Sequence, residues 1–293
     1  MSRSLRTVLP ALCLALAGTA GTVHAQVSAY AVTTNSQGVQ QLVRFNPFAP
    51  GAVSTVGPTG VRLTGIDFRP LTNVLYGYDG NLLYTVNVTT GAATLEFDVG
   101  NSTGNVGFDF NPTVDRIRVI DATGGNLRLN PITGTTTTDL PYAFAPGDIN
   151  VGVTPAFTAV AYTNSDNDPA TGTTLFGIDV NLRQLITITN PNGGTISTVG
   201  SLGLGPLSAI TGFDILTQGT INTAFFAATS VGASVSRLYT VNLGTGAATL
   251  IGDIGSATAI EGLALTAVPE PGTWALLALG LCGVGVVARR RRA

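Results

Sequence analysis

The chain of 293 residues contains no lysine, one histidine and two cysteines. The histidine, His24, and both cysteines, Cys13 and Cys282, lie near the two ends of the chain. Residues 26–267 therefore contain no lysine, histidine or cysteine. Their absence excludes a disulfide framework, a Ser-His-Asp or Cys-His nucleophile, a histidine-based zinc site and a Schiff-base lysine from this region. Only carboxylates, tyrosines and arginines remain for chemistry, so we expect no enzymatic activity and no cofactor.

Positive charge is also scarce in the middle of the chain. All 14 basic residues are arginines, and residues 26–267 hold eight of them against 15 acidic residues, a net charge near −7. Nucleic-acid binding needs a basic surface, so we expect none. Arg116, Arg118 and Arg128 form a local basic patch. In so acidic a region we expect these arginines to pair with aspartates.

What the sequence does contain is repetition. Residues 83–95 (LYTVNVTTGAATL) recur almost unchanged at 238–250 (LYTVNLGTGAATL). Alternating Leu, Tyr, Thr and Val side chains favour a strand on a packed, pleated surface, with successive side chains on opposite faces. Asn87 and Gly91 then predict a tight turn, because an Asn side chain binds turn amides and Gly adopts positive φ. The same hairpin used several times indicates a repeat protein.

A second motif opens each repeat. Residues 65–70 (GIDFRP) have a near twin at 107–112 (GFDFNP), a shorter copy at 212–215 (GFDI) and a remnant at 262–265 (GLAL). The first two opening glycines are 42 residues apart, close to the ~40–45 residues of a four-stranded propeller blade. The repeats thus define blades of about four strands each.

Counting strands leaves one at the end of the region, within 263–266, and three at its start, within 29–56. Together they complete a fifth blade, and such closure protects the edges of the sheets. We therefore predict an all-β, five-bladed β-propeller in which the first and last strands share one blade. A parallel β-helix would need shorter periods, and a β-sandwich would not explain the duplicated block.

Three aspartates, Asp67, Asp109 and Asp214, recur at one position of the opening motif. They could form a ring of carboxylates near the propeller axis that binds a cation. Alternatively, each could make the same hydrogen bond to a neighbouring backbone or arginine and so fix its blade. The repetition favours the second interpretation, because a binding site usually involves only one or two blades.

The polar loop at 164–168 (NSDND) is a weak calcium candidate. Asp166 and Asp168 could supply two of the six to eight oxygen ligands that calcium takes. The spacing does not match an EF-hand loop, so a polar turn before Pro169 is the favoured interpretation.

The first 25 residues predict a signal peptide. Arg3 and Arg6 precede an apolar stretch at 8–17, and Val23-His24-Ala25 resembles a small-residue cleavage site. We expect signal peptidase to cut between Ala25 and Gln26. A first core helix is the alternative, but the order of charge, apolar run and small residues matches an export signal.

The last 26 residues have three parts. Val268-Pro269-Glu270-Pro271 comes first, an uncharged apolar stretch spans 273–288, and four arginines occupy 289–292. Sixteen helical residues would span about 24 Å, slightly short of a ~30 Å hydrocarbon core. We expect a C-terminal transmembrane helix with the arginines inside. The terminal arginines argue against the alternative of a buried helix.

These three parts, in this order, resemble the PEP-CTERM sorting signal of Gram-negative bacteria. The resemblance implies recognition by an exosortase, processing near Pro269-Glu270-Pro271, and export alongside extracellular polysaccharide. The central region, roughly 30–266, resembles an uncharacterised family of secreted bacterial domains through its opening motifs and its Leu-Tyr-Thr-x-Asn hairpins. That resemblance supports the repeat fold and implies no activity.

The sequence thus predicts a signal peptide (1–25), a β-propeller domain (26–267) and a sorting tail (268–293). We expect an exported, non-enzymatic interaction or structural protein of the envelope or matrix, with an extracellular glycan or surface protein as partner. The membrane would hold it through the C-terminal helix before processing. The alternative is a secreted carbohydrate-active enzyme that uses carboxylates in the propeller mouth.

Overall fold

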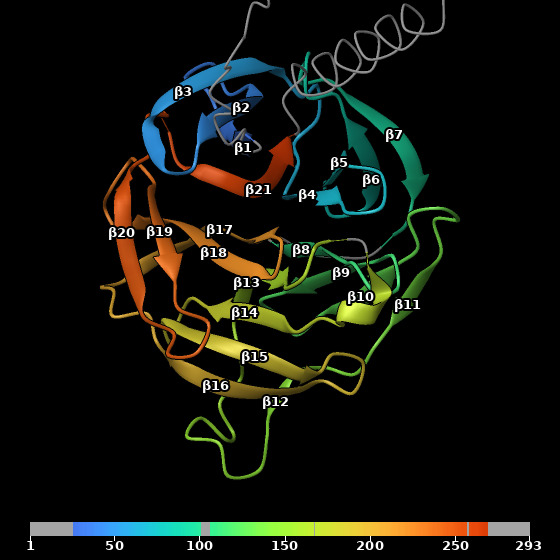
Figure 1. Cartoon of the computed structure of the whole chain (residues 1–293), viewed down its shortest axis with the longest axis vertical. Helices are drawn as coiled ribbons and strands as arrows, with labels where there is room; N and C mark the ends of the chain where they lie inside the picture. Colours follow the sequence, from blue (N-terminus) through green and yellow to red (C-terminus); the bar gives the residue numbers. More distant parts are fainter. Residues whose placement is uncertain (1–25, 101–105, 167, 257, 269–293) are drawn as a thin grey trace, which may run out of the picture. The chain divides into compact units, whose positions relative to one another are not determined.

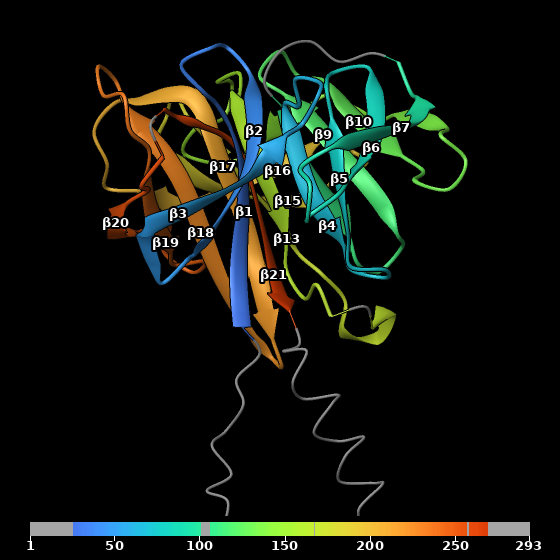
Figure 2. The ribbon, with the colours of Figure 1, turned by 90° about the horizontal axis from the view of Figure 1, so that it is seen from above.

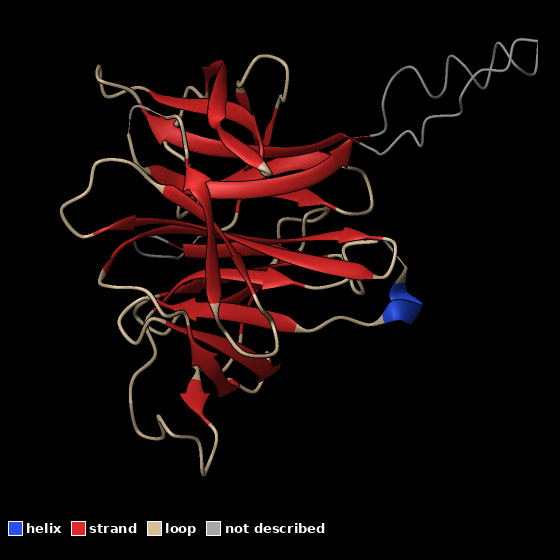
Figure 3. Cartoon of the chain, turned by 60° about the vertical axis from the view of Figure 1, so that its left-hand side comes forward, coloured by secondary structure: helices blue, strands red, loops and turns tan. Residues whose placement is uncertain are grey.

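The structure, a computed structural model, describes residues 26–100, 106–166, 168–256 and 258–268. The predicted signal helix and C-terminal transmembrane helix lie outside these residues. Val27–Val268 form one compact unit, built almost entirely of strands (Figure 3). The one helical segment among the described residues is the 3-10 turn η1 (Pro169–Thr171). In this part of the chain, no helix has the length and apolar character needed to span a membrane.

Five sheets make up the unit, and each is one blade of a propeller (Figure 1). We number the blades from the first complete one. Blade 1 contains β4 (Gly65–Arg69), β5 (Val74–Tyr78), β6 (Leu82–Val86) and β7 (Ala93–Asp98). Blade 2 contains β8 (Val106–Asn111), β9 (Arg116–Asp121), β10 (Asn126–Leu129) and β11 (Thr136–Thr138).

Blade 3 contains β13 (Phe157–Tyr162), β14 (Leu175–Asp179), β15 (Gln184–Asn190), β16 (Thr195–Ser201) and β12 (Ala143–Phe144). Blade 4 contains β17 (Leu207–Gln218), β18 (Ile221–Ser230), β19 (Arg237–Val241) and β20 (Ala248–Asp253). Blade 5 contains β21 (Ile260–Val268), β1 (Gln26–Thr34), β2 (Gln40–Asn46) and β3 (Ala49–Pro58).

The first strand of each sheet lies at the centre of the propeller. These inner strands contact one another in the order β4, β8, β13, β17, β21 and back to β4, which closes the ring. In blade 5 the last strand of the described chain, β21, pairs with β1, and the two run side by side in Figure 2. The predicted five blades and the shared closing blade are confirmed.

Blade 3 has a fifth strand that the sequence analysis did not anticipate. Ala143 and Phe144 in β12 pair in parallel with Thr195 and Ile196 at the outer edge of β16. The side chain of Phe144 is buried in the apolar cluster between blades 2 and 3. The short strand therefore covers an edge that would otherwise present unpaired backbone groups.

The hydrophobic core is divided into five clusters, and each cluster lies between two neighbouring blades. Strand β6 shows how the alternation of side chains produces this arrangement. Leu83 packs in the cluster of blades 1 and 2, whereas Tyr84 and Val86 pack in the cluster of blades 5 and 1. The predicted alternation in this strand is thus confirmed, and both faces of the strand are buried.

The repeated hairpin ends in the predicted turn. The side-chain oxygen of Asn87 accepts hydrogen bonds from the amides of Thr89 (2.8 Å) and Thr90 (3.0 Å), and Gly91 has a φ of +83°. A Cβ on Gly91 would clash with the backbone of Gly57 in blade 5. The turn is therefore pressed directly against the preceding blade.

The second copy of the hairpin makes the same contact in blade 4. Gly246, with a φ of +79°, lies against Gly200 of blade 3. Beside each contact, an amide at the start of the return strand donates a hydrogen bond to a carbonyl of the preceding blade. In the first hairpin Ala93 donates to Thr59 (3.0 Å), and in the second Ala248 donates to Leu202 (3.1 Å). The duplicated sequence thus forms the turn that packs each of these two blades against the preceding one.

We predict that Gly91→Ala destabilises the propeller much more than Gly38→Ala. Both glycines have a φ near +80°, but a Cβ on Gly38 would meet no atom within 4 Å. Gly38→Ala should lower the free energy of unfolding by about 1–2 kcal/mol, the cost of a left-handed backbone. Gly91→Ala should lower it by roughly 2 kcal/mol more, because the blades must separate. Urea unfolding of the two variants measures the difference, and equal losses would disprove the inter-blade contact.

Candidate functional site

The three repeated aspartates meet at the centre of the propeller. Asp67, Asp109 and Asp214 lie on the inner strands β4, β8 and β17, and all three side chains are buried. One carboxylate oxygen from each lies within 4.8 Å of the others. The sequence predicted their common position in the repeat, and the fold brings them together on one axis.

Each aspartate also connects its blade to the next. Asp67 accepts hydrogen bonds from the amide of Phe68 in its own strand (2.7 Å) and from the amide of Phe110 in blade 2 (2.8 Å). Asp214 likewise accepts from the amides of Ile215 and Leu265, the latter in blade 5. The interpretation of these residues as repeated hydrogen bonds to neighbouring backbone is confirmed, and the structure shows that the bonds cross from one blade to the next.

The third link of this kind runs from blade 2 to blade 3. The carboxylate of Asp109 accepts a hydrogen bond from the amide of Tyr162 on β13 (2.9 Å). In blade 2 the bonded amide, that of Phe110, directly follows the aspartate of that blade. The residues that directly precede the bonded amides of Tyr162 and Leu265 are Ala161 and Ala264, so blades 3 and 5 have alanine at the aspartate position. Three carboxylates rather than five therefore share the axis.

The glycine of the opening motif, two residues before the aspartate, also lies at the contact between neighbouring inner strands. A Cβ on Gly65 would overlap the side chain of Phe108, and one on Gly107 or Gly212 would overlap Val160 or Leu263 of the next inner strand. Glycine therefore lets neighbouring inner strands approach closely enough for the aspartate to reach across. This is why Gly and Asp recur together in the sequence.

Burial makes these carboxylates unusually weak acids. Burial raises the pKa of Asp67 well above its ordinary value, and the nearby charge of Asp214 raises it further. Burial and the charges of Asp67 and Asp214 act in the same way on the pKa of Asp109. Burial raises the pKa of Asp214 to about 6, although its two amide hydrogen bonds lower it. The cluster offers oxygen ligands of the type hard cations prefer, but it also favours protons.

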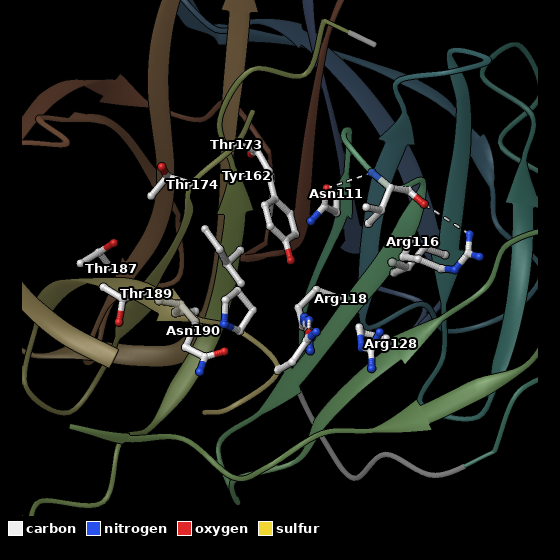
Figure 4. A pocket seen from close by; sticks show the side chains of 16 residues that line it. Asn111, Arg116, Arg118, Arg128, Tyr162, Thr173, Thr174, Thr187, Thr189 and Asn190 are labelled. Carbon is white, nitrogen blue, oxygen red and sulfur yellow. Dashed lines mark hydrogen bonds between the residues drawn. The ribbon is translucent and has the colours of Figure 1, made fainter. Parts of the chain in front are cut away.

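A second candidate site is a cavity of about 750 Å³ between blades 2 and 3 (Figure 4). One wall comes from β8, β9, β10 and the turn between β8 and β9. The other comes from β13, β15, the residues that follow β15, and the start of β14 with the two residues before it. Its polar lining consists of Asn111, Arg116, Arg118, Arg128, Tyr162, Thr173, Thr174, Thr187, Thr189, Asn190 and Asn192. The basic patch of the sequence therefore lines a cavity.

Arg118 lies at the centre of a buried polar network. It is only 3% exposed, and its Nη1 donates hydrogen bonds to Asn126 (2.7 Å) and Asp139 (2.6 Å). Its Nη2 donates to Asn192 (2.7 Å) from blade 3. Among the described residues its buried Nε has no hydrogen-bond partner. Figure 4 shows the hydroxyl of Tyr162 directed toward this guanidinium.

The other two arginines differ in how their charge is balanced. Arg128 forms a bidentate pair with Asp139, the same carboxylate that Arg118 contacts. Burial raises the pKa of Asp139, but the hydrogen bonds from Arg128 and Arg118 outweigh it and hold the pKa below its ordinary value. Arg116 forms no ion pair within the described chain and donates to the carbonyls of Val114 and Asp115. The predicted pairing with aspartates is confirmed for two arginines and wrong for Arg116.

The calcium candidates lie elsewhere, in the loop before β14. Asp166 accepts hydrogen bonds from the amide of Asp168 (3.0 Å) and the hydroxyl of Thr171 (3.1 Å). Asp168 caps the 3-10 turn by accepting from the amide of Ala170 (2.9 Å). Both carboxylates thus shape the loop, as expected for the polar-turn interpretation.

The sequence analysis missed the blade 3 side of the cavity. Tyr162, Thr187, Thr189 and Asn192 belong to no repeated motif. They come next to the arginines only because blade 3 packs on blade 2, so no local sequence signal could identify them. Alternating threonines in β15 are also a common feature of ordinary strands.

We predict that the stability of the protein falls as the pH rises from about 4 to 7. The axial aspartates have raised pKa values in the folded state, so the unfolded chain, with aspartate pKa values near 3.9, loses its protons first. For Asp214 alone, a pKa of about 6 corresponds to a loss on the order of 2–3 kcal/mol. Asp139 and Asp148 have lowered pKa values in the folded state, so their protonation lowers stability only below about pH 4.

Asp214→Asn tests this assignment, with Asp253→Asn, at an exposed side chain, as the control. The free energy of unfolding, measured at pH 4, 5, 6 and 7, should decline less steeply in Asp214→Asn than in the wild type. The control should retain the full decline. A wild-type stability that stays level or rises over this range would contradict the assignment.

Comparison with known proteins gives two family matches. The model of a domain of unknown function, DUF4394, matches residues 41–264, and the PEP-CTERM protein-sorting motif matches residues 267–292. Both resemblances drawn from the sequence are therefore confirmed. A search of curated proteins found no match.

Solved structures show only distant likeness. A structural genomics protein of unknown function from Bacteroides thetaiotaomicron matches at 15% identity and a TM-score of 0.49, covering 78% of this chain and 56% of its own. Hydrazine synthase of Kuenenia stuttgartiensis matches at 10% identity and a TM-score of 0.41, covering 65% and 49%. The chain thus spans about half of each, and TM-scores below 0.5 support no conclusion about it. By the family model that covers most of its length, the chain belongs to the family of the domain of unknown function DUF4394.

Proposed function

We propose that this protein is a non-enzymatic binding module of the cell envelope or extracellular matrix, associated with extracellular polysaccharide. The PEP-CTERM motif marks the chain as an exported protein and implies processing by an exosortase. The observation that carries the binding role is the cavity between blades 2 and 3, which is large enough for a small ligand. Its walls offer arginine, threonine and asparagine side chains, which suit a polar, hydroxyl-rich ligand.

The same lining supports binding rather than hydrolysis. A glycosidase needs two carboxyl groups about 5–10 Å apart beside the bond to be cleaved. No Asp or Glu is among the residues that line the cavity in the described chain. The axial aspartates are buried and bonded to backbone amides. We therefore favour the binding module over the carbohydrate-active enzyme.

We predict that the protein loses its tail during export. In wild-type cells the mature protein should lack the residues after the Pro269-Glu270-Pro271 motif and should be absent from the inner membrane. In cells without the exosortase the tail should remain attached, and the protein should stay in that membrane. Fractionation followed by mass spectrometry of the intact protein distinguishes the two. An intact tail in the inner membrane of wild-type cells would refute the proposal.

We also predict saturable binding of the exported protein to its host's extracellular polysaccharide. The protein, purified from its host after processing, is titrated with the polymer, once with calcium and once with a chelator. Loss of binding in the chelator would implicate Asp166 and Asp168. The chain length of the polymer should stay constant during incubation. Shortening of the polymer would support the enzyme instead, and absence of binding in both conditions would overturn the polysaccharide association.

A further inference from the structure

We propose that the arginine-lined cavity between blades 2 and 3 binds a carboxylate-bearing saccharide, such as a uronic acid unit of an acidic polysaccharide. The inference rests on the proposed function and specifies its site and its ligand class. It follows from the charge of the cavity, the donors left free on its arginines and the polar wall opposite them.

The charge of the cavity is opposite to that of the domain. Residues 26–267 carry a net charge near −7, yet three of their eight arginines line this one cavity. Asp139 behind them balances one positive charge. The cavity therefore keeps about two positive charges inside an acidic protein. Such an arrangement attracts an anionic group to the cavity.

Two of the arginines have N–H groups available for a ligand. Arg128 has five N–H donors, of which Asp139 takes those of Nε and one of Nη2, and its side chain is 34% exposed. Within the described residues, Arg116 donates to two backbone carbonyls, both through Nη1. Both side chains lie along the same wall of the cavity in Figure 4. The planar guanidinium matches a carboxylate through two parallel hydrogen bonds, as the Arg128–Asp139 pair already demonstrates.

The wall opposite the arginines suits the hydroxyls of a sugar. Thr173, Thr174, Thr187 and Thr189 line it, together with Asn190. Figure 4 shows these side chains across the cavity from the arginines, with Tyr162 between the two walls. Threonine hydroxyls and asparagine amides both donate and accept hydrogen bonds, as sugar hydroxyls do.

The lining also argues against a nucleotide as the ligand. Tyr162 is the one aromatic residue among the lining residues, and it is only 2% exposed. A base therefore has no open aromatic face on which to stack. The negative charge of the domain would further repel a polymer of phosphates. A saccharide with isolated carboxylates needs no open aromatic face for base stacking and is not a polymer of phosphates, so neither argument applies to it.

Arg116→Gln is the decisive variant. Arg116 forms no ion pair within the described chain, so its removal leaves no buried carboxylate uncompensated. Arg118 would be a poor choice, because its loss would strand Asp139 and Asn192. Arg44→Gln, an exposed arginine of blade 5, removes the same charge at a distance from the cavity and serves as the control.

The ligands are oligomers of galacturonate, glucuronate and mannuronate, each as the free acid and as the methyl ester. The processed protein should bind at least one free acid, and its methyl ester should bind at least about tenfold more weakly, since esterification removes charge-assisted hydrogen bonds. Arg116→Gln should weaken binding of that acid by about tenfold and leave binding of its ester unchanged. Arg44→Gln should bind like the wild type.

Binding to none of the three acids, equal binding of acid and ester, or an unchanged affinity in Arg116→Gln would each overturn the inference. The host polysaccharide separates this failure from that of the proposed function. If the wild type and Arg116→Gln bind the host polymer equally well, the binding module stands and the cavity is not its site. If the wild type binds a free acid as expected but not the host polymer, the cavity assignment stands and the association with the host polysaccharide fails.

Discussion

The structure depends on hydrogen bonds between buried carboxylates and backbone amides at the propeller axis. Asp67, Asp109 and Asp214 each accept an amide hydrogen bond from the next inner strand, and so couple three of the five blade interfaces. Burying three carboxylates within 4.8 Å of one another is unfavourable, as their raised pKa values indicate. The amide bonds partly offset this penalty. The opening glycines make the arrangement sterically feasible by letting the inner strands approach.

One of these bonds also shapes the cavity. The amide of Tyr162 donates to Asp109 at the axis, while its side chain lies in the cavity beside Arg118 (Figure 4). The carboxylate that links blade 2 to blade 3 therefore positions a residue shared by the two blades. Asn192 of blade 3 makes a second connection by accepting from Arg118 of blade 2. The walls of the cavity are held by the same contacts that hold the propeller together.

The distribution of charge connects this architecture to the proposed binding role. Most of the domain is acidic, and the concentration of arginine occurs where two blades leave a space between them. Asp139 compensates Arg118 and Arg128 only in part, and Arg116 stays without an ion pair in the described chain. On this distribution of charge rests our proposal that the cavity binds an acidic saccharide outside the cell.

The sequence by itself determined the repeat, the five blades and the closure of the ring, because these features follow from local patterns. The hairpins at 83–95 and 238–250 and the Gly-x-Asp motifs show period and strand order directly. It also indicated a structural role for the aspartates, since a residue repeated with the blade usually serves the blade. Only the tertiary structure decided that β12 adds a fifth strand to blade 3 and that Arg116, Thr187 and Thr189 line the same cavity. These features depend on contacts between residues far apart in the chain, and such contacts leave no periodic signal in the sequence.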